Sequence, residues 1–203
     1  MGSLYPNHVL ASHLNFVVAG APSFWTSPLQ ALRHATGGYT AAEKAGLERT
    51  RWFRQRGSGY SQLHGTKPHT PGFSLVDSPV GLLAWIYEKL RDWTDAYPWT
   101  DDEVLTWVSI YLFSDAGADA SLRIYYETMK AAYNLTSWNK TPLGLSYFPK
   151  DLILLPSSWG HTIGPVVFEK RHEKGGHFAS IEEPELLVAD LRQTVRNAKI
   201  PSQ

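Results

Sequence analysis

The stretch LGLSYFPKD, residues 143–151, decides the fold, because it is an apolar run that stops at a proline and is followed by an acid, Asp151. Short apolar runs between turn residues are typical of buried strands. We therefore expect a strand over residues 143–148, with Asp151 just beyond its carboxyl end. In α/β sheets the functional side chains gather at the carboxyl ends of the strands, which makes Asp151 a candidate site residue.

The next stretch of the chain has the same arrangement, a strand followed by a candidate site residue. The run PVVFEKR, residues 165–171, predicts a second strand, and the pair Gly175-Gly176 then precedes His177 on a loop. An acid and a histidine that leave neighbouring strand ends can lie side by side. The carboxylate then accepts the imidazole N–H and fixes the tautomer, which leaves the other ring nitrogen as a general base. The alternatives are that Asp151 is a turn or helix-cap residue and that His177 is an ordinary surface residue beside a tight turn.

Outward from these strands, the chain alternates between strand and helix patterns. A run within residues 9–20 predicts a first strand, and the capping box Thr100–Glu103 marks a helix start. Helices are expected at residues 41–53, 78–94, 101–113, 118–132 and 184–198. The last of these is amphipathic, and its apolar residues Val188, Leu191 and Val195 are expected to face inward.

Strands that alternate with helices indicate an α/β sheet, here only part of one, with a mostly helical lid inserted into it. We expect three regions along the chain. Residues 1–20 would be the remnant of a core helix and strand, residues 21–100 a helical lid or cap, and residues 101–203 the C-terminal part of the core.

The composition narrows the classes of function. The 203 residues carry 19 Lys and Arg against 19 Asp and Glu, so no net positive charge favours nucleic acid or an anionic membrane as a partner. No apolar run reaches the ~20 residues of a membrane helix. The sequence has no cysteine, which excludes a disulfide framework and a thiol nucleophile. This suits a reducing compartment, and we expect a cytoplasmic protein.

Other motifs with a known chemistry are missing from the sequence. It has no G-x-S-x-G elbow, no P-loop and no dinucleotide fingerprint, and its histidines lack metal-ligand spacing, so we expect neither a cofactor nor a metal. Two tyrosines are further candidates, Tyr60 and Tyr125. A phenol that stays protonated can donate a hydrogen bond to a developing negative oxygen. The alternative for each tyrosine is ordinary packing.

Five segments, taken together and in order, make the sequence similar to a known family. No single motif among them is specific enough to do so alone. The set is Gly-Tyr (59–60), SPVGLLAWIYEK (78–89), IYYE (124–127), FPKD (148–151) and GGHFASIEEPE (175–185). In this order the segments resemble the epoxide hydrolases of the α/β-hydrolase fold, most closely the microsomal-type and fungal branch.

The resemblance implies an activity and four site residues. In this family two lid tyrosines hold and protonate the epoxide oxygen, and the matching positions are Tyr60 and Tyr125. An aspartate nucleophile opens the ring to give an ester, and a histidine oriented by an acid then activates water to release the vicinal diol. The matching positions are His177 as the general base and Asp151 as the acid that orients it. The implied partners are a small apolar epoxide and water, and fungal relatives suggest detoxification or specialised metabolism.

The sequence differs from the family pattern at its N-terminal end. The family's nucleophile stands in a G-x-D-W-G-like elbow ahead of a segment that resembles residues 3–9, and residues 1–203 hold no counterpart, so no nucleophile is assigned. We therefore expect the C-terminal two thirds of a family member, with impaired activity on its own and an unpaired edge on its first strand.

Two alternatives remain open. One is a non-catalytic remnant or pseudoenzyme that acts as a binding or partner subunit, a second copy of the chain included. The other is a dehalogenase, which also uses an aspartate nucleophile. The paired tyrosines count against it, because indole N–H groups hold a leaving halide better.

Overall fold

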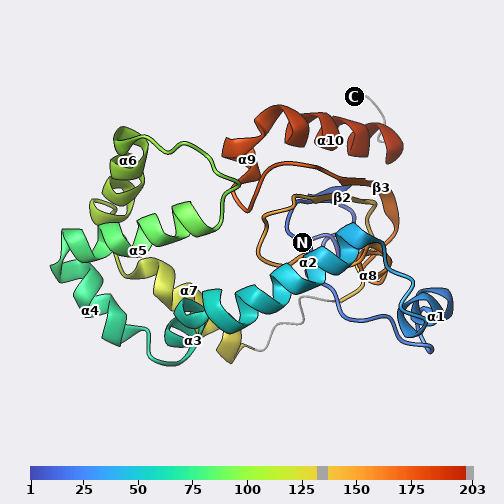
Figure 1. The fold of residues 1–203 in the computed structure, drawn as a ribbon, viewed down its shortest axis with the longest axis horizontal. Helices are drawn as coiled ribbons and strands as arrows, with labels where there is room; N and C mark the ends of the chain where they lie inside the picture. Colours follow the sequence, from blue (N-terminus) through green and yellow to red (C-terminus); the bar gives the residue numbers. More distant parts are fainter. Residues whose placement is uncertain (132–136, 200–203) are drawn as a thin grey trace. The chain divides into compact units, whose positions relative to one another are not determined.

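The computed structural model describes residues 1–131 and 137–199, and these fall into two compact units. One unit combines Met1–Phe53 with Asn134–Gln203 and contains the sheet. The other unit is Arg54–Tyr133, and its described part is helical. Figure 1 shows the chain coloured along the sequence, so that the two ends of the first unit are blue and red.

The first unit is built on a parallel sheet, which in the described residues has the strand order β1-β2-β3. Strand β1 is Ser12–Leu14, β2 is Leu143–Tyr147 and β3 is Val166–Arg171. The two strands expected from residues 143–148 and 165–171 are thus confirmed. The first strand is much shorter than the run of residues 9–20. In the described residues β1 pairs with β2 on one side only, which places it at an edge of the sheet.

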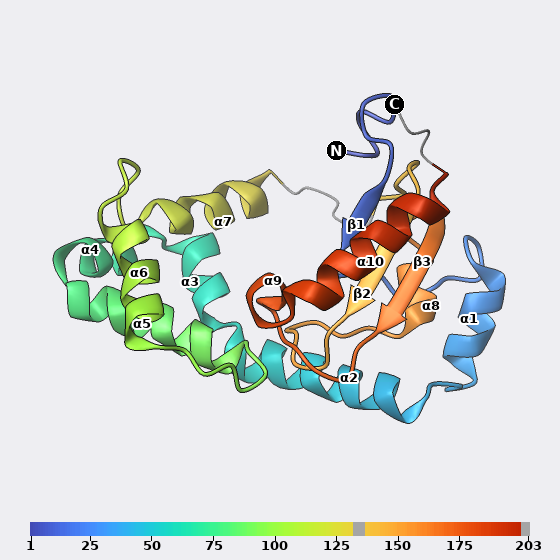
Figure 2. The same cartoon turned by 90° about the horizontal axis from the view of Figure 1, so that it is seen from above.

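The two faces of β2 are covered differently, as the alternation of side chains along a strand requires. Leu143, Leu145 and Tyr147 are buried in an apolar cluster on one face. Gly144 and Ser146 point to the other face, which is covered by helix α10, Pro184–Asn197 (Figure 2). A side chain at position 144 would collide with the residues that α10 and β1 present there, so this glycine permits the close approach of the helix.

Helix α10 turns a different face to the sheet from the one expected. Val188, Leu191 and Val195 are 44%, 47% and 43% exposed, so the prediction that they face inward is wrong. The residues of α10 that are buried are Asp190 and Thr194, at 2% and 1% exposure. The apolar pattern was misleading because the sheet face beneath this helix carries polar side chains, and these select polar partners.

A buried network of hydrogen bonds explains why α10 turns polar side chains toward the sheet. The Asp190 carboxylate accepts hydrogen bonds from the Ser146 hydroxyl at 2.6 Å and from Nε2 of His172 at 2.6 Å. His13 joins the same network, with Nε2 at 3.0 Å from the Ser146 hydroxyl and Nδ1 at 2.8 Å from the Thr194 hydroxyl. Buried polar groups are tolerated when they satisfy one another in this way.

The remaining helices of the first unit are short or begin at clear sequence signals. The helix expected at residues 41–53 is confirmed, and Thr40 and Glu43 form a capping box at its start. The elements are α1 (Pro28–Ala35), α2 (Ala41–Trp52), α8 (Ser157–Gly160) and α9 (Ala179–Glu182). The π-helix η1 (Phe53–Gly57) follows α2, and its residues from Arg54 onward belong to the second unit.

The described part of the second unit consists of helices around an apolar core. The helices are α3 (Gly59–Thr66), α4 (His69–Asp77), α5 (Pro79–Asp92), α6 (Asp101–Leu112) and α7 (Ala120–Lys130). Its core contains Leu75, Leu82, Val108, Ala118 and Leu122.

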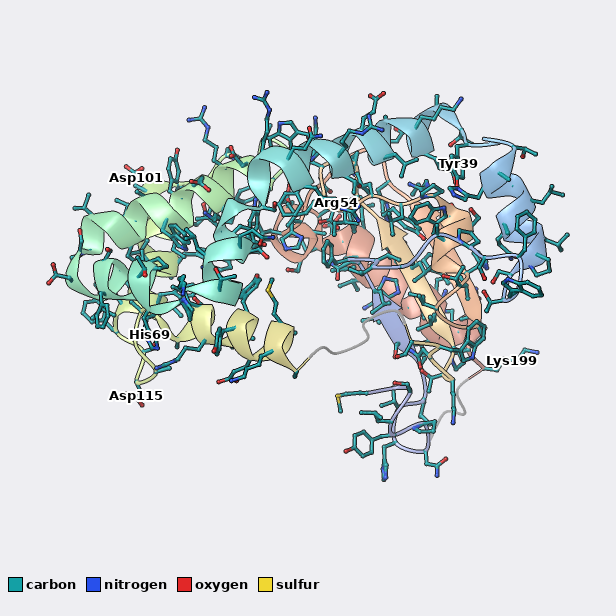
Figure 3. All side chains as sticks on the ribbon, turned by 90° about the horizontal axis from the view of Figure 1, so that it is seen from below. Tyr39, Arg54, His69, Asp101, Asp115 and Lys199 are labelled. Carbon is teal, nitrogen blue, oxygen red and sulfur yellow. The ribbon has the colours of Figure 1, made fainter. Side chains whose placement is uncertain are left out.

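Several sequence signals of the second unit are confirmed. Ser78 caps α5, and the capping box of Thr100 and Glu103 starts α6 at Asp101, which is labelled in Figure 3. The helices expected at 78–94 and 101–113 are present. The helix expected at 118–132 is present as α7, and position 132 lies outside the described residues. Helices α3 and α4 were not expected, because glycine and proline interrupt their patterns.

The two compact units differ in extent from the three expected regions, 1–20, 21–100 and 101–203. Residues 21–53 belong with the sheet, and the described residues of 101–133 belong with the helices. The reason is packing between neighbours, since α6 packs on α5 and α7 packs on α3. Within residues 1–131 and 137–199, no helix combines the length and the apolar character that crossing a membrane would take.

Candidate active site

The loop after β2 holds Asp151 in a buried position. Its backbone N–H donates to the carbonyl of Phe148 at 3.1 Å, and its carboxylate oxygen Oδ1 accepts the backbone N–H of Leu152 at 2.7 Å. Asp151 is only 2% exposed. The backbone of its own loop therefore fixes where this carboxylate points.

The loop after β3 is tied to the loop after β2. The backbone N–H of Lys150 donates to the carbonyl of Gly175 at 3.1 Å, and Lys150 and Gly176 form an isolated parallel bridge. Gly175 has φ +99, a conformation that other residues adopt only with strain, and a Cβ there would collide with the Phe148 ring. This glycine thus allows the two loops to meet.

The two loops bring Asp151 and His177 together. Nδ1 of His177 lies 2.7 Å from Oδ1 of Asp151, so the imidazole N–H donates to the carboxylate. The His177 side chain is 24% exposed, whereas that of Asp151 is 4% exposed. The Phe16 ring packs edge-on against the imidazole, with ring centroids 5.2 Å apart. This arrangement can fix the tautomer of His177 and leave Nε2 to accept a proton from water.

Two residues that sequence reasoning missed hold these loops. A carboxylate oxygen of Glu182 accepts the backbone N–H groups of Gly176 and Phe178, at 3.1 and 3.2 Å. The Arg49 guanidinium on α2 donates to the backbone carbonyls of Lys150 and Asp151, at 3.2 and 3.3 Å. Glu182 lies within the segment 175–185, so that segment could have indicated it. No sequence signal pointed to Arg49.

The two candidate tyrosines meet inside the helical unit. Tyr60 on α3 and Tyr125 on α7 have ring centroids 5.7 Å apart and an interplanar angle of 80°. Burial raises the pKa of Tyr60, and the neighbouring phenol of Tyr125 raises it further. A phenol with a raised pKa stays protonated and remains a hydrogen-bond donor.

The four sequence-predicted residues therefore form two pairs, one in each compact unit. His177 and Asp151 are in contact in the first unit, and Tyr60 and Tyr125 are in contact in the second. That both pairs surround one small molecule stays a prediction, and so do the roles of the four residues.

The buried network under α10 also contains serine, histidine and aspartate, but its geometry does not suit nucleophilic catalysis. Ser146 is fully buried and donates to Asp190 rather than to His172. A serine nucleophile needs a histidine as its base and access to substrate. Across the part of the chain that the structure describes, no cluster of three or more histidine and acidic side chains could hold a metal ion.

Several proteins similar to this chain are epoxide hydrolases. The chain itself matches no protein-family model. Epoxide hydrolase 1 of Oryctolagus cuniculus is 32% identical over 213 aligned residues, which cover 94% of this chain and 46% of that protein. The structure of the Aspergillus niger epoxide hydrolase superposes with a TM-score of 0.79 at 36% identity and covers 95% of this chain and 47% of the other.

A third comparison shows likeness in fold alone. The structure of juvenile hormone epoxide hydrolase from the silkworm Bombyx mori has a TM-score of 0.79 at 24% identity, and covers 98% of this chain and 51% of the other. The chain spans about half the length of the relatives it matches, so the expected share of two thirds was too large. It follows, as the ordered segments had indicated, that the chain belongs to the epoxide hydrolases of the α/β-hydrolase fold and represents part of that fold.

Proposed function

We propose that these residues serve the hydrolysis of an apolar organic epoxide to a vicinal diol through an ester intermediate. The observation that carries the proposal is the 2.7 Å contact between Nδ1 of His177 and the buried carboxylate of Asp151. Such a pair suits the deprotonation of water. Similar proteins that are themselves named epoxide hydrolases support the choice of an epoxide as the substrate.

The proposed reaction has two steps. In the first, a carboxylate of the protein attacks a ring carbon, the C–O bond breaks, and the oxygen takes a proton from the phenol of Tyr60 or Tyr125. In the second, His177 takes a proton from water, whose oxygen attacks the ester carbonyl, and the imidazolium returns that proton to the departing alcohol. The carboxylic acid then loses its proton and the phenolate regains one, so that the net reaction is epoxide plus water to diol.

None of the residues assigned here is the attacking carboxylate. We therefore propose that residues 1–203 by themselves turn over little epoxide, because the loss of one member of a cooperating set removes most of the catalysis. The test is diol formation from styrene oxide by the purified 203-residue chain. Robust turnover that is lost on His177→Gln would show that this chain contains its own nucleophile.

A chimera tests the assigned roles. The part of the Aspergillus niger enzyme that this chain does not match would be fused in front of residues 1–203, so that His177 and Asp151 come from this chain. We expect diol formation that falls by about a hundredfold or more in His177→Gln, the size of a general-base contribution. Tyr60→Phe and Tyr125→Phe should each slow ring opening. Diol formation that is unchanged in all three variants would contradict the proposal.

An alternative function is a non-catalytic subunit that binds a ligand or a partner, a second copy of the chain included. The exposed apolar residues Val188, Leu191 and Val195 on α10 favour it, because apolar side chains that share one helix face can form an interface. Size-exclusion chromatography of the 203-residue chain would test this alternative, which predicts a stable oligomer. The cytoplasmic location and a role in detoxification or specialised metabolism stay predictions.

A further inference from the structure

Arg49 on α2 binds the backbone of the loop that carries Asp151. Its Nη2 donates to the carbonyl of Lys150 at 3.2 Å, and its Nε donates to the carbonyl of Asp151 at 3.3 Å. The guanidinium also lies over the ring of Trp52, 4.3 Å from the centroid and about one turn further along the same helix. A planar guanidinium presents its N–H donors in a fixed fork, so it can hold two successive carbonyls at once.

Helix α2 is itself fixed to this loop, which gives Arg49 a firm base. The Thr50 hydroxyl, on a residue that is 4% exposed, accepts the backbone N–H of Leu154 at 2.8 Å. One turn earlier, Gly46 packs so closely on Leu154 that an added Cβ would lie 2.9 Å from the Leu154 Cβ. Because α2 cannot shift away from the loop without breaking these contacts, the donors of Arg49 stay at the two carbonyls.

The carbonyl that Nε of Arg49 binds belongs to the peptide group between Asp151 and Leu152. The N–H of that same group donates to Oδ1 of Asp151 at 2.7 Å. In a planar trans peptide the C=O and the N–H point in opposite directions, so a partner that fixes one of them also fixes the other. By holding the carbonyl, Arg49 directs the N–H at the carboxylate. A cation on the carbonyl also polarises the peptide group, which strengthens the N–H as a donor.

Oδ1 of Asp151 is also the atom that meets His177. Nδ1 of the imidazole lies 2.7 Å from this oxygen, and the Asp151 side chain is 4% exposed. Its position therefore depends on two donors, one from its own loop and one from the imidazole. If the peptide group turned, the carboxylate would lose the donor that does not come from His177 and could rotate away from the ring.

We propose that Arg49 is a positioning residue for Asp151, which it orients through the peptide group between Asp151 and Leu152. The inference rests on the proposed function, because it takes Asp151 as the acid that orients His177. The effect passes from the guanidinium to the peptide group, and from there to the carboxylate and the imidazole. A lysine at position 49 offers a single ammonium in place of the fork, so it should keep only part of the effect.

The first test follows the hydrogen bond between His177 and Asp151 and needs no activity. In the 203-residue chain with ¹⁵N-labelled histidines, the resonance of the proton on Nδ1 of His177 is assigned by its loss in His177→Gln. Arg49→Met removes the donors and keeps most of the aliphatic length of the side chain. We expect the resonance to move upfield or to disappear through exchange with water, and Arg49→Lys should restore it in part.

Two control variants on α2 separate positioning from a general loosening of the fold. Arg51→Met makes the same substitution at an exposed position and should leave the resonance in place. Thr50→Val removes the other contact of α2 with the loop and should lower the melting temperature while the resonance stays.

Two outcomes of this test would overturn the inference. One is a resonance that Arg49→Met leaves unchanged, and the other is a resonance that Thr50→Val shifts as far as Arg49→Met does. If Arg49→Met does not fold, Arg49→Lys decides, because a resonance identical to that of the parent chain would contradict the need for the fork.

An activity measurement separates this inference from the proposed function. In single turnovers of the chimera, Arg49→Met should leave ester formation unchanged. It should slow ester hydrolysis by about tenfold or more, which is part of what a general base contributes. If His177→Gln has no effect in the chimera, the proposed function fails, whatever Arg49→Met does to the resonance. If His177→Gln slows ester hydrolysis and Arg49→Met does not, the positioning role of Arg49 fails.

Discussion

Asp151 and His177 are 26 residues apart in sequence, yet Oδ1 of Asp151 lies 2.7 Å from Nδ1 of His177. The same oxygen accepts the backbone N–H of Leu152, so the carboxylate is fixed by its own loop as well as by the imidazole. Because each loop leaves the carboxyl end of a neighbouring parallel strand, the register of β2 and β3 determines this contact.

Replacement of Asp151 by asparagine should abolish most of the activity of the chimera. The amide no longer stabilises an imidazolium or selects the tautomer with its N–H on Nδ1, so we expect kcat to fall by about 10³–10⁴-fold. The measurement is steady-state diol formation from styrene oxide. Asp115→Asn, at an exposed position of the helical unit, is the control and should change kcat less than twofold, a change of roughly 0.4 kcal/mol in the barrier. A loss below tenfold in Asp151→Asn would argue against the pairing.

Gly175→Ala should destabilise the chain by about 1–3 kcal/mol or more. The residue has φ +99, and an added methyl group would collide with the Phe148 ring. The measurement is urea unfolding followed by tryptophan fluorescence. Gly20→Ala is the matched control, because its methyl group would meet no other atom within 4 Å. Equal unfolding midpoints for the two variants would contradict the positive φ of Gly175 and its close approach to the Phe148 ring.

Asp190→Ala should destabilise the chain strongly. The substitution leaves the buried groups of Ser146 and His172 without their acceptor, and the loss of one partner of a buried pair costs about 3–5 kcal/mol. By contrast, Val195→Lys lies on the exposed face of α10 and should change stability by less than about 0.5 kcal/mol. Denaturant unfolding measures the stability of both variants. If Val195→Lys proved as costly as Asp190→Ala, the apolar face of α10 would be buried after all.

The stability of the chain should fall as the pH drops below about 6.5. Burial lowers the pKa of His13, against the opposing charge of Asp190, so the folded state binds a proton at this ring less readily than the unfolded state does. Between the lowered pKa and about 6.5 the unfolded state holds more protons, and the free energy of unfolding therefore decreases with falling pH.

The free energy of unfolding measured from pH 7.5 to 5 checks this prediction. His13→Asn should flatten the dependence, whereas His69→Asn at the exposed position should leave it as steep as in the parent chain. A His13→Asn chain with an unchanged slope would locate the pH dependence at other groups.

Local signals in the sequence were sufficient to predict much of the secondary structure of this protein. The apolar runs before Pro149 and after Pro165 gave both long strands, and the capping box at Thr100 gave the start of α6, because such signals act within a few residues. The positions of Asp151 and His177 beyond their strands followed from the same reasoning. The resemblance to a family supplied Tyr60 and Tyr125 and the order of the segments.

Only the tertiary structure decided which faces of these elements are buried and which polar groups meet. The face of α10 could not be predicted, because the alternation along β2 places Ser146 beneath the helix, and that polar group is best satisfied by Asp190 rather than by Val195. The anchoring of the Asp151 loop by Arg49 likewise joins residues that are about a hundred positions apart. Sequence periodicity records local geometry, whereas burial and long-range hydrogen bonding depend on what the packed partner presents.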